Sequence, residues 1–131
     1  MEADQFTLEE ANTLVSWLQA KFYKLETRRQ EYMTLKKRYD EIVYDPTKDG
    51  STEDHELAQT SANLKDLAAH IEDDVQEILD RGIIVRDVTS GLVDFPSQRD
   101  GREIFLCWIG GEDSIEFWHE TNQGFGSRKP I

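Results

Sequence analysis

The sequence predicts an α+β protein in which a long antiparallel helical hairpin is followed by a small antiparallel β-sheet. Two observations lead to this expectation. Apolar residues recur at helical spacing through residues 7–81, with a single interruption by a segment that contains Pro and Gly. After Gly82 the pattern changes to short β-branched and aromatic runs separated by turn residues. With 131 residues the chain is expected to form a single domain, residues 1–131, with the hairpin at 7–81 and a β-rich part at 82–131.

The first helix is expected to run without interruption from Leu8 to about Val43. It begins with Thr7-Leu8-Glu9-Glu10, a capping box in which Thr7 and Glu10 satisfy the free amides of the first turn. No Gly or Pro occurs before Pro46. An apolar row then repeats every seven residues, as in a coiled coil, and consists of Ala11, Leu18, Leu25, Tyr32 and Tyr39.

The second helix is expected to begin near Ser51 or Thr52, after a turn at 45–50. Pro46 cannot continue the first helix, and Asp49-Gly50 favours a reversal. Gly82 is expected to end the second helix. Because the connection is short, the two helices are predicted to pack antiparallel.

The antiparallel arrangement also predicts ion pairs between the helices. Lys21 and Arg28 interrupt an apolar row of the first helix. Folding the chain about its turn places Lys21 near Asp73 and Asp74, and Arg28 near Asp66. The two cations would then have partners, which is the simplest reason for their position.

Short strands separated by turns are expected after Gly82. Pro96 is predicted to close the second strand, and Asp100-Gly101 favours a tight hairpin. Residues 110–113 form the next expected turn, and residues 121–131 are expected to form a loop. The predicted strands are Ile83–Val85, Leu92–Phe95, Glu103–Ile109 and Ser114–Trp118.

Counting from these turns places three carboxylates on one side of the sheet. Cys107 is expected to face Glu116, Glu103 to face Glu120, and Asp94 to lie opposite Phe105. Like charges on facing strands are destabilising, so such a cluster needs a cation, a proton or solvent. Arg102, Arg128 or a metal ion are the candidate cations. A slip of one residue in either hairpin would move side chains to the other face.

Two interpretations of this cluster remain open. If the last strand bends, His119 converges with Glu120, and carboxylates with an imidazole suit a divalent metal. Asp94, His119 and Glu120 are therefore the candidate metal ligands, and with Arg128 they form the candidate functional cluster. In the structural interpretation Asp94 caps a turn, His119 is half-buried and Glu120 pairs with Arg128. Structural ion pairs are commoner than functional sites, which favours the second interpretation.

Other catalytic motifs are absent from the sequence. His119-Glu120 is followed by Gln123 rather than a second His, so the zinc-protease helix motif is not present. Gly124-Phe125-Gly126 lacks the helix that follows a phosphate-binding loop. Cys107 has no plausible general base in the sequence and is expected to pack in the core.

The composition restricts the possible partners and location. A net charge of -12 argues against nucleic acid and anionic membranes as partners, since both require a basic surface. No apolar run approaches the roughly 18 residues of a membrane span. The single Cys and the acidic N-terminus, which has no apolar leader segment, favour the cytoplasm.

Several motifs resemble those of a known family. They are the opening residues 6–12, Gly91–Pro96, Leu106–Trp108, and Trp118–Glu120 followed by Gly124-Phe125 and Arg128. Together they resemble the prokaryotic family catalogued as domain of unknown function 2203, over nearly the whole chain. The resemblance implies a small prokaryotic cytoplasmic protein and no particular activity. It favours Asp94, His119, Glu120 and Arg128 as the positions to test.

Two functional hypotheses follow. In the first, the chain is a non-enzymatic interaction or scaffold protein without a cofactor, whose helical hairpin associates with another copy or with a protein partner. In the alternative, it is a divalent-metal-binding protein or a small metal-dependent hydrolase. Asp94, Glu120 and His119 would then hold the metal, and Arg128 would hold an anionic substrate.

Overall fold

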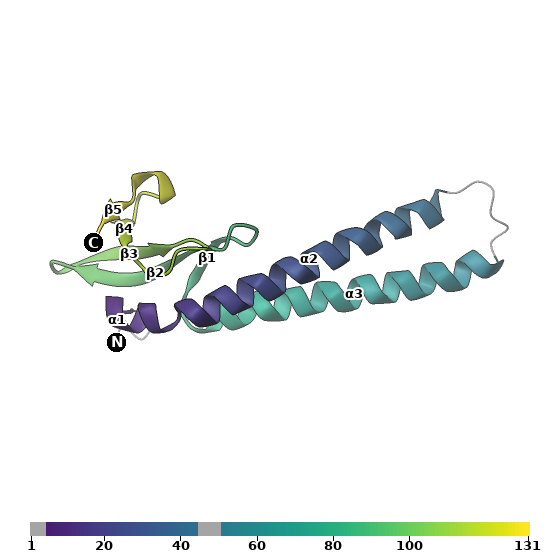
Figure 1. Ribbon diagram of the computed structural model, residues 1–131, viewed down its shortest axis with the longest axis horizontal. Helices are drawn as coiled ribbons and strands as arrows, with labels where there is room; N and C mark the ends of the chain where they lie inside the picture. Colours follow the sequence, from purple (N-terminus) through teal and green to yellow (C-terminus); the bar gives the residue numbers. More distant parts are fainter. Residues whose placement is uncertain (1–4, 45–50) are drawn as a thin grey trace. The chain divides into compact units, whose positions relative to one another are not determined.

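The computed structural model of the chain describes residues 5–44 and 51–131, with the side chains of 51–54 excepted. Its helices and five-stranded antiparallel sheet make the fold α+β, as predicted (Figure 1). The predicted turn at 45–50 lies outside the described residues. The elements are α1 (Leu8–Thr13), α2 (Val15–Val43), α3 (Ser51–Asp80), β1 (Ile84–Asp87), β2 (Leu92–Arg99), β3 (Arg102–Trp108), β4 (Phe117–Glu120), η1 (Phe125–Ser127) and β5 (Lys129–Pro130).

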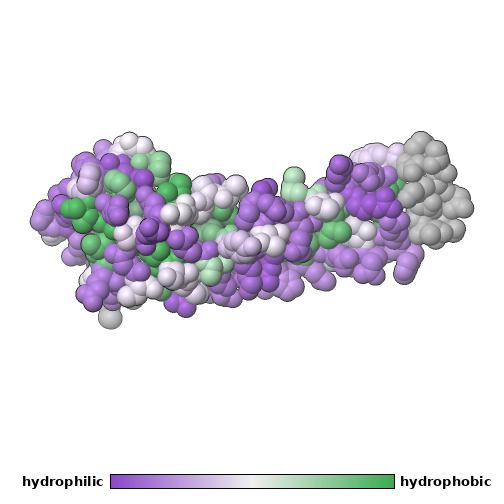
Figure 2. Space-filling view, in the orientation of Figure 1, coloured by the Kyte–Doolittle hydropathy of each residue, from purple (hydrophilic) through white to green (hydrophobic). Residues whose placement is uncertain are grey.

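The chain divides into two compact units. The sheet unit consists of Met1–Lys24 and Val75–Ile131, and the helical unit consists of Leu25–Asp74. Figure 2 shows hydrophilic residues over most of the helical unit, whereas apolar residues are more frequent in the sheet unit. No helix in the described part of the chain is long and apolar enough to cross a membrane.

The first helix begins as predicted but is interrupted. Thr7 and Glu10 form the capping box, with the Thr7 amide donating to the Glu10 carboxylate and the Glu10 amide donating to the Thr7 hydroxyl. The expected continuous helix is wrong at Leu14, where α1 ends and α2 follows. The Thr13 hydroxyl donates to the Glu10 carbonyl at 2.6 Å. The Leu14 amide therefore bonds to the Ala11 carbonyl instead, which tightens the turn and interrupts the helix.

Ion pairs connect α2 and α3 in both units. In the sheet unit Lys21 pairs with Glu77 at 2.5 Å. In the helical unit Arg28 pairs with Asp74 rather than with the expected Asp66. The expectation counted residues from the turn. Away from the turn a pair forms only where both side chains face the opposite helix, and this displaces the partner of Arg28 by about two helical turns.

The sheet is a meander in which β1 to β5 are neighbours in sequence order. The prediction that Pro96 closes the second strand is wrong, because β2 continues to Arg99 and Pro96 lies opposite Phe105. β1 pairs with β2 only as far as Asp94, so β2 has no strand on that side at Pro96. Proline has no backbone N–H, and at this unpaired edge no neighbouring strand needs one. The Pro96 carbonyl accepts from the Phe6 amide at 2.7 Å.

The register differs from the prediction in both hairpins. Asp94 lies opposite Cys107 rather than Phe105, because Asp100 and Gly101 alone form the turn, at φ values of 54° and 80°. In the next hairpin Cys107 lies opposite Phe117. Its connection is longer than the expected turn, because the Glu112 carboxylate accepts from the Ile109 amide and its carbonyl accepts from Trp108 Nε1.

The apolar core of the sheet unit lies between the helices and one face of the sheet. Ala11, Val15, Leu18 and Phe22 of α1 and α2 are buried. The Phe22 ring lies 6.3 Å from the Trp108 ring, and this contact joins helix and sheet. The buried sheet residues on this face include Val93, Phe95, Ile104, Leu106, Trp108 and Trp118.

Gly91 offers a test of close packing in the sheet unit. Its φ is 70°, and a Cβ there would lie 3.3 Å from Phe22 Cγ. Gly101 is the matched control, since its φ is 80° and nothing lies within 4 Å of its Cβ position. Gly101→Ala should lower the free energy of unfolding by about 1–2 kcal/mol through backbone strain alone. Gly91→Ala should cost about 1–3 kcal/mol more, because Phe22 must also move.

Chemical denaturation of both variants measures the difference. Equal losses for Gly91→Ala and Gly101→Ala would contradict the close approach of Phe22 to Gly91.

Candidate functional site

The candidate site lies on the sheet face opposite the apolar core. The strand registers place Asp94 of β2, Cys107 of β3 and His119 of β4 on this same face. Their three strands are adjacent in the sheet (Figure 1). Each residue offers one metal-ligating atom, and these atoms all lie within 4.8 Å of one another. The three residues are at most 2% exposed. A carboxylate, a thiol and an imidazole are thus held together away from solvent.

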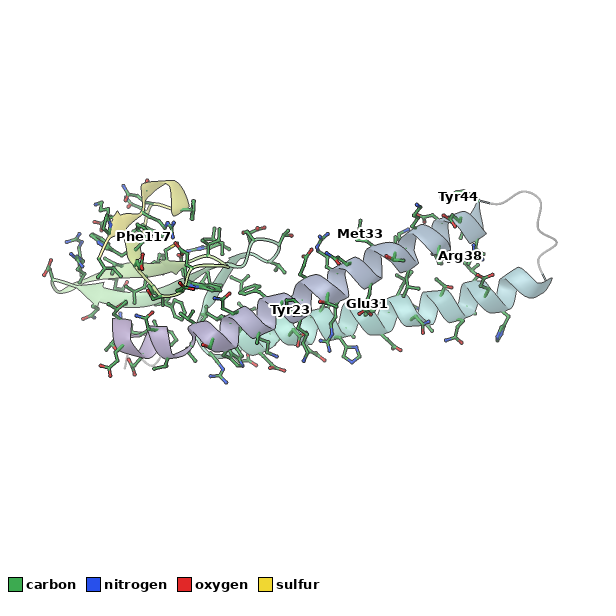
Figure 3. All side chains as sticks on the ribbon, in the orientation of Figure 1. Tyr23, Glu31, Met33, Arg38, Tyr44 and Phe117 are labelled. Atoms are coloured by element: carbon green, nitrogen blue, oxygen red, sulfur yellow. The ribbon has the colours of Figure 1, made fainter. Side chains whose placement is uncertain are left out.

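The segment after β4 forms one wall of a pocket at this site. Arg128 anchors the segment: its guanidinium lies 4.2 Å from the Phe117 ring centroid and 4.1 Å from that of Phe125, and it donates to the Glu112 carboxylate at 3.1 Å (Phe117 is labelled in Figure 3). The pocket has a volume of about 420 Å³. Its lining residues are Arg86, Leu92, Asp94, Cys107, His119, Thr121, Asn122, Gln123, Gly124 and Phe125.

Both ring nitrogens of His119 lie within hydrogen-bond distance of an oxygen atom. Nδ1 lies 2.8 Å from the Glu120 carbonyl oxygen, which can only accept, so Nδ1 carries a hydrogen. Nε2 lies 2.9 Å from Asp94 Oδ1. A neutral imidazole with its hydrogen on Nδ1 would direct the Nε2 lone pair at a carboxylate oxygen. At 2.9 Å the two atoms are at hydrogen-bond distance, so they share a proton unless a bound metal ion displaces it.

The other oxygen of Asp94 is bound by an arginine. Arg86 of β1 donates from Nε to Asp94 Oδ2 at 2.8 Å, and its guanidinium lies 5.2 Å from the Phe105 ring centroid. The Arg86 side chain is 44% exposed, whereas that of Asp94 is 3% exposed. Arg86 therefore gives the buried carboxylate a charged hydrogen-bond partner on the solvent side of the site.

The Cys107 thiol is neutral at physiological pH. Its pKa is raised to about 12, first by burial and then by the nearby Asp94 carboxylate, against the opposing effect of Arg128. Both ring nitrogens of His119 are already engaged, so the imidazole is not placed to take the thiol proton. The arrangement is therefore unlike an activated cysteine nucleophile. A bound metal ion would reverse the preference, because a coordinated thiol loses its proton.

The structure brings together two of the residues singled out from the sequence, separates Glu120 from them, and leaves Arg128 near the Cys107 thiol, where it opposes the rise of the thiol pKa. Asp94 and His119 are in contact. Glu120 points to the opposite face, since β4 continues through it without a bend, and it accepts from Arg102 at 2.6 Å. This bond lowers the pKa of Glu120. Arg128 pairs with Glu112.

The structural interpretation drawn from the sequence also fails in its details. Asp94 lies within a strand instead of capping a turn, and His119 is fully buried rather than half-buried. The partners of Glu120 are Arg102 and Lys129, and Arg128 is not among them.

Sequence reasoning missed Cys107 and Arg86. Cys107 was assigned to the core because no base was visible near it in the sequence, yet correct hairpin registers place it directly opposite Asp94. Ile84 of β1 lies opposite Asp94. Arg86 is two residues further along the strand, on the same face as Ile84, so the register of β1 would have indicated that Arg86 lies near Asp94. In both cases the missing information was strand pairing rather than residue type.

Comparison with known proteins gives a family and nothing more specific. Residues 5–131 match the family described as "Uncharacterized conserved protein (DUF2203)". No curated protein and no solved structure matches the chain.

The raised pKa of Cys107 predicts a loss of stability in alkali. An unfolded thiol titrates near 9.0, whereas the folded one holds its proton to about 12. Between these values the unfolded state binds fewer protons, so the free energy of unfolding falls by about 1.4 kcal/mol per pH unit as pH rises. Cys107→Ser lacks this contribution. Between pH 9 and about pH 10.5 the metal-free wild type should lose about 2 kcal/mol more than the variant.

Urea denaturation at a series of pH values, with chelator present, makes this comparison. Parallel pH profiles for wild type and Cys107→Ser would show that the thiol titrates normally in the folded protein.

Proposed function

The chain belongs to the DUF2203 family, for which the match supplies no activity, and from its site we propose that it is a divalent-metal-binding protein of the zinc class. The proposed ligands are Asp94, Cys107 and His119. Asp94 and His119 were also expected as ligands from the sequence, whereas the Cys107 thiol takes the place of the expected Glu120.

The observation that carries the proposal is the convergence of a buried carboxylate, thiol and imidazole whose ligating atoms all lie within 4.8 Å of one another. The Glu120 carbonyl holds the hydrogen on Nδ1, which is the usual arrangement of a metal-binding imidazole. Carboxylate oxygen, imidazole nitrogen and thiolate sulfur are all established zinc donors.

The surroundings also suit such an ion. Arg86 binds the outer oxygen of Asp94 and so orients the carboxylate. Three protein ligands would leave a fourth position open to the adjoining pocket of about 420 Å³. An open position of this kind holds the water molecule in metal-dependent hydrolases. Hydrolysis is therefore the reaction class that we propose for this site.

Metal titration tests the proposal. Metal-free wild type should take up about one Zn²⁺ or Co²⁺ per chain, and Co²⁺ should produce a thiolate charge-transfer band. Cys107→Ser should abolish this band. Both Cys107→Ser and His119→Gln should weaken binding by more than the roughly 10- to 100-fold typical of an outer-shell change.

Glu120→Gln is the matched control, because Glu120 points to the other face and should leave metal affinity unchanged. Near-UV circular dichroism establishes that each variant is folded. If wild type binds no metal, or if Cys107→Ser binds it equally well, the metal proposal is wrong and a shared proton accounts for the contact between His119 and Asp94.

A second candidate function is self-association through the helical unit. We propose that α2 and α3 form an antiparallel, coiled-coil-like hairpin there, supported by the pairs Arg28–Asp74 and Arg38–Glu56. Only a few apolar residues of this unit are buried. The half-buried ones include Tyr32, Leu35, Tyr39, Leu57, Leu67 and Ile71.

The favoured partner is a second copy of the hairpin. Met33 is 57% exposed and Tyr44 is 79% exposed. Figure 3 places both on the side of α2 that faces away from α3. A second hairpin would cover this side as well as the half-buried row.

Sedimentation over a range of concentrations tests this candidate. The wild type should form a dimer, and the double variant Met33→Glu, Tyr44→Glu should weaken it by more than about tenfold, as expected for central interface residues. Thr34→Glu adds one negative charge at an exposed polar position of α2 and should have less effect than Met33→Glu or Tyr44→Glu made singly. A wild type that stays monomeric at every concentration would exclude self-association.

The remaining expectations from the sequence stay proposals. The single Cys supports a reducing, cytoplasmic location, and the resemblance supports a prokaryotic origin.

A further inference from the structure

Arg86 has binding capacity that its pairing with Asp94 does not use. Only Nε donates to the carboxylate. The two terminal nitrogens make no hydrogen bond to any residue that the structure describes, and the side chain is 44% exposed. Arg86 also lines the pocket beside the proposed metal ligands. These two nitrogens form the planar fork that binds carboxylate and phosphate groups.

The rest of the pocket suits a small polar ligand. Thr121, Asn122 and Gln123 contribute a hydroxyl and two amides, all on exposed residues. Leu92 and Phe125 contribute apolar surface. A volume of about 420 Å³ lies at the lower end of the roughly 300–1,000 Å³ found for small-molecule pockets.

The charge of the site favours an anion in a chain whose net charge is -12. Asp94 is the only acidic residue among those lining the pocket. With a divalent ion bound, the carboxylate of Asp94 and the thiolate of Cys107 cancel the charge of the metal. Arg86 then remains as an uncompensated cation at the wall of the pocket.

We infer that the pocket binds a small molecule through an oxyanion group, either a carboxylate or a phosphate. One oxygen of this group occupies the open position of the metal, and another accepts from the terminal nitrogens of Arg86. This inference rests on the proposed metal site, and it names the ligand class of the same pocket. It also assigns to Arg86 the anion-binding role that the sequence suggested for Arg128, whose guanidinium is held by Glu112 and two aromatic rings.

Calorimetric titration of the zinc-loaded full chain tests the inference, with inorganic phosphate and acetate as separate probes. At least one probe should bind, and the tighter of the two identifies the source of the oxyanion. Arg86→Lys keeps a cation beside Asp94 but lacks the fork. With the site kept saturated with zinc, it should weaken binding of that probe by about 10- to 100-fold, separately from any effect that this outer-shell change has on zinc affinity. Arg86→Gln should weaken it at least as much.

Arg102→Gln is the matched control. Arg102 is 52% exposed and also pairs with a carboxylate, that of Glu120 on the other face of the sheet, so its loss should leave anion affinity unchanged. Equal anion affinity in wild type and Arg86→Lys would overturn the role of Arg86.

The experiment separates the two proposals. If zinc binds stoichiometrically but neither phosphate nor acetate binds, the oxyanion inference is wrong and the metal site stands. If the wild type takes up no metal, the proposed function fails, and the inference that depends on the open metal position fails with it.

Discussion

The contact between buried Asp94 and buried His119 is the constraint on which the strand arrangement of the sheet unit depends. An ionised carboxylate is tolerated in the interior only when it is paired. Asp94 obtains its partners from two other strands, Arg86 on β1 and His119 on β4. A slip of one residue in either strand would turn a partner to the other face and leave the carboxylate unpaired. The pairing therefore fixes the register of β1 and β4 relative to β2.

The two faces of the sheet are stabilised by different means. One face is apolar, and α1 with the start of α2 covers it through contacts such as that between Phe22 and Trp108. The other face carries the polar cluster beneath the short segment that Arg128 anchors. A helix buries far more apolar surface than such a segment. The proposed metal site accordingly lies on the face whose cover is smaller and leaves a pocket.

Local signals in the sequence predicted much of the fold. The capping box at Thr7 and the left-handed Gly82 at the end of α3 are present, and Asp100-Gly101 turns the hairpin as expected. The interruption at Leu14 was missed because it depends on a hydroxyl–carbonyl hydrogen bond of Thr13, which no apolar pattern reports. The site was half predicted. Asp94 and His119 were identified by residue type, whereas Cys107 required the strand register, and a longer connection around Glu112 changed that register.

A purely structural account of the cluster explains its geometry but not its composition. A proton shared between Asp94 and His119 would satisfy both residues. However, a buried ionic pair commonly stabilises a fold no better than apolar residues of similar size. An apolar set on the same three strands would avoid the desolvation of a carboxylate and an imidazole and would need no arginine. The cluster instead places three metal-ligating atoms within 4.8 Å of one another at the wall of a pocket. Ligand binding accounts for both the residue types and their position, which is why we favour it over a structural role.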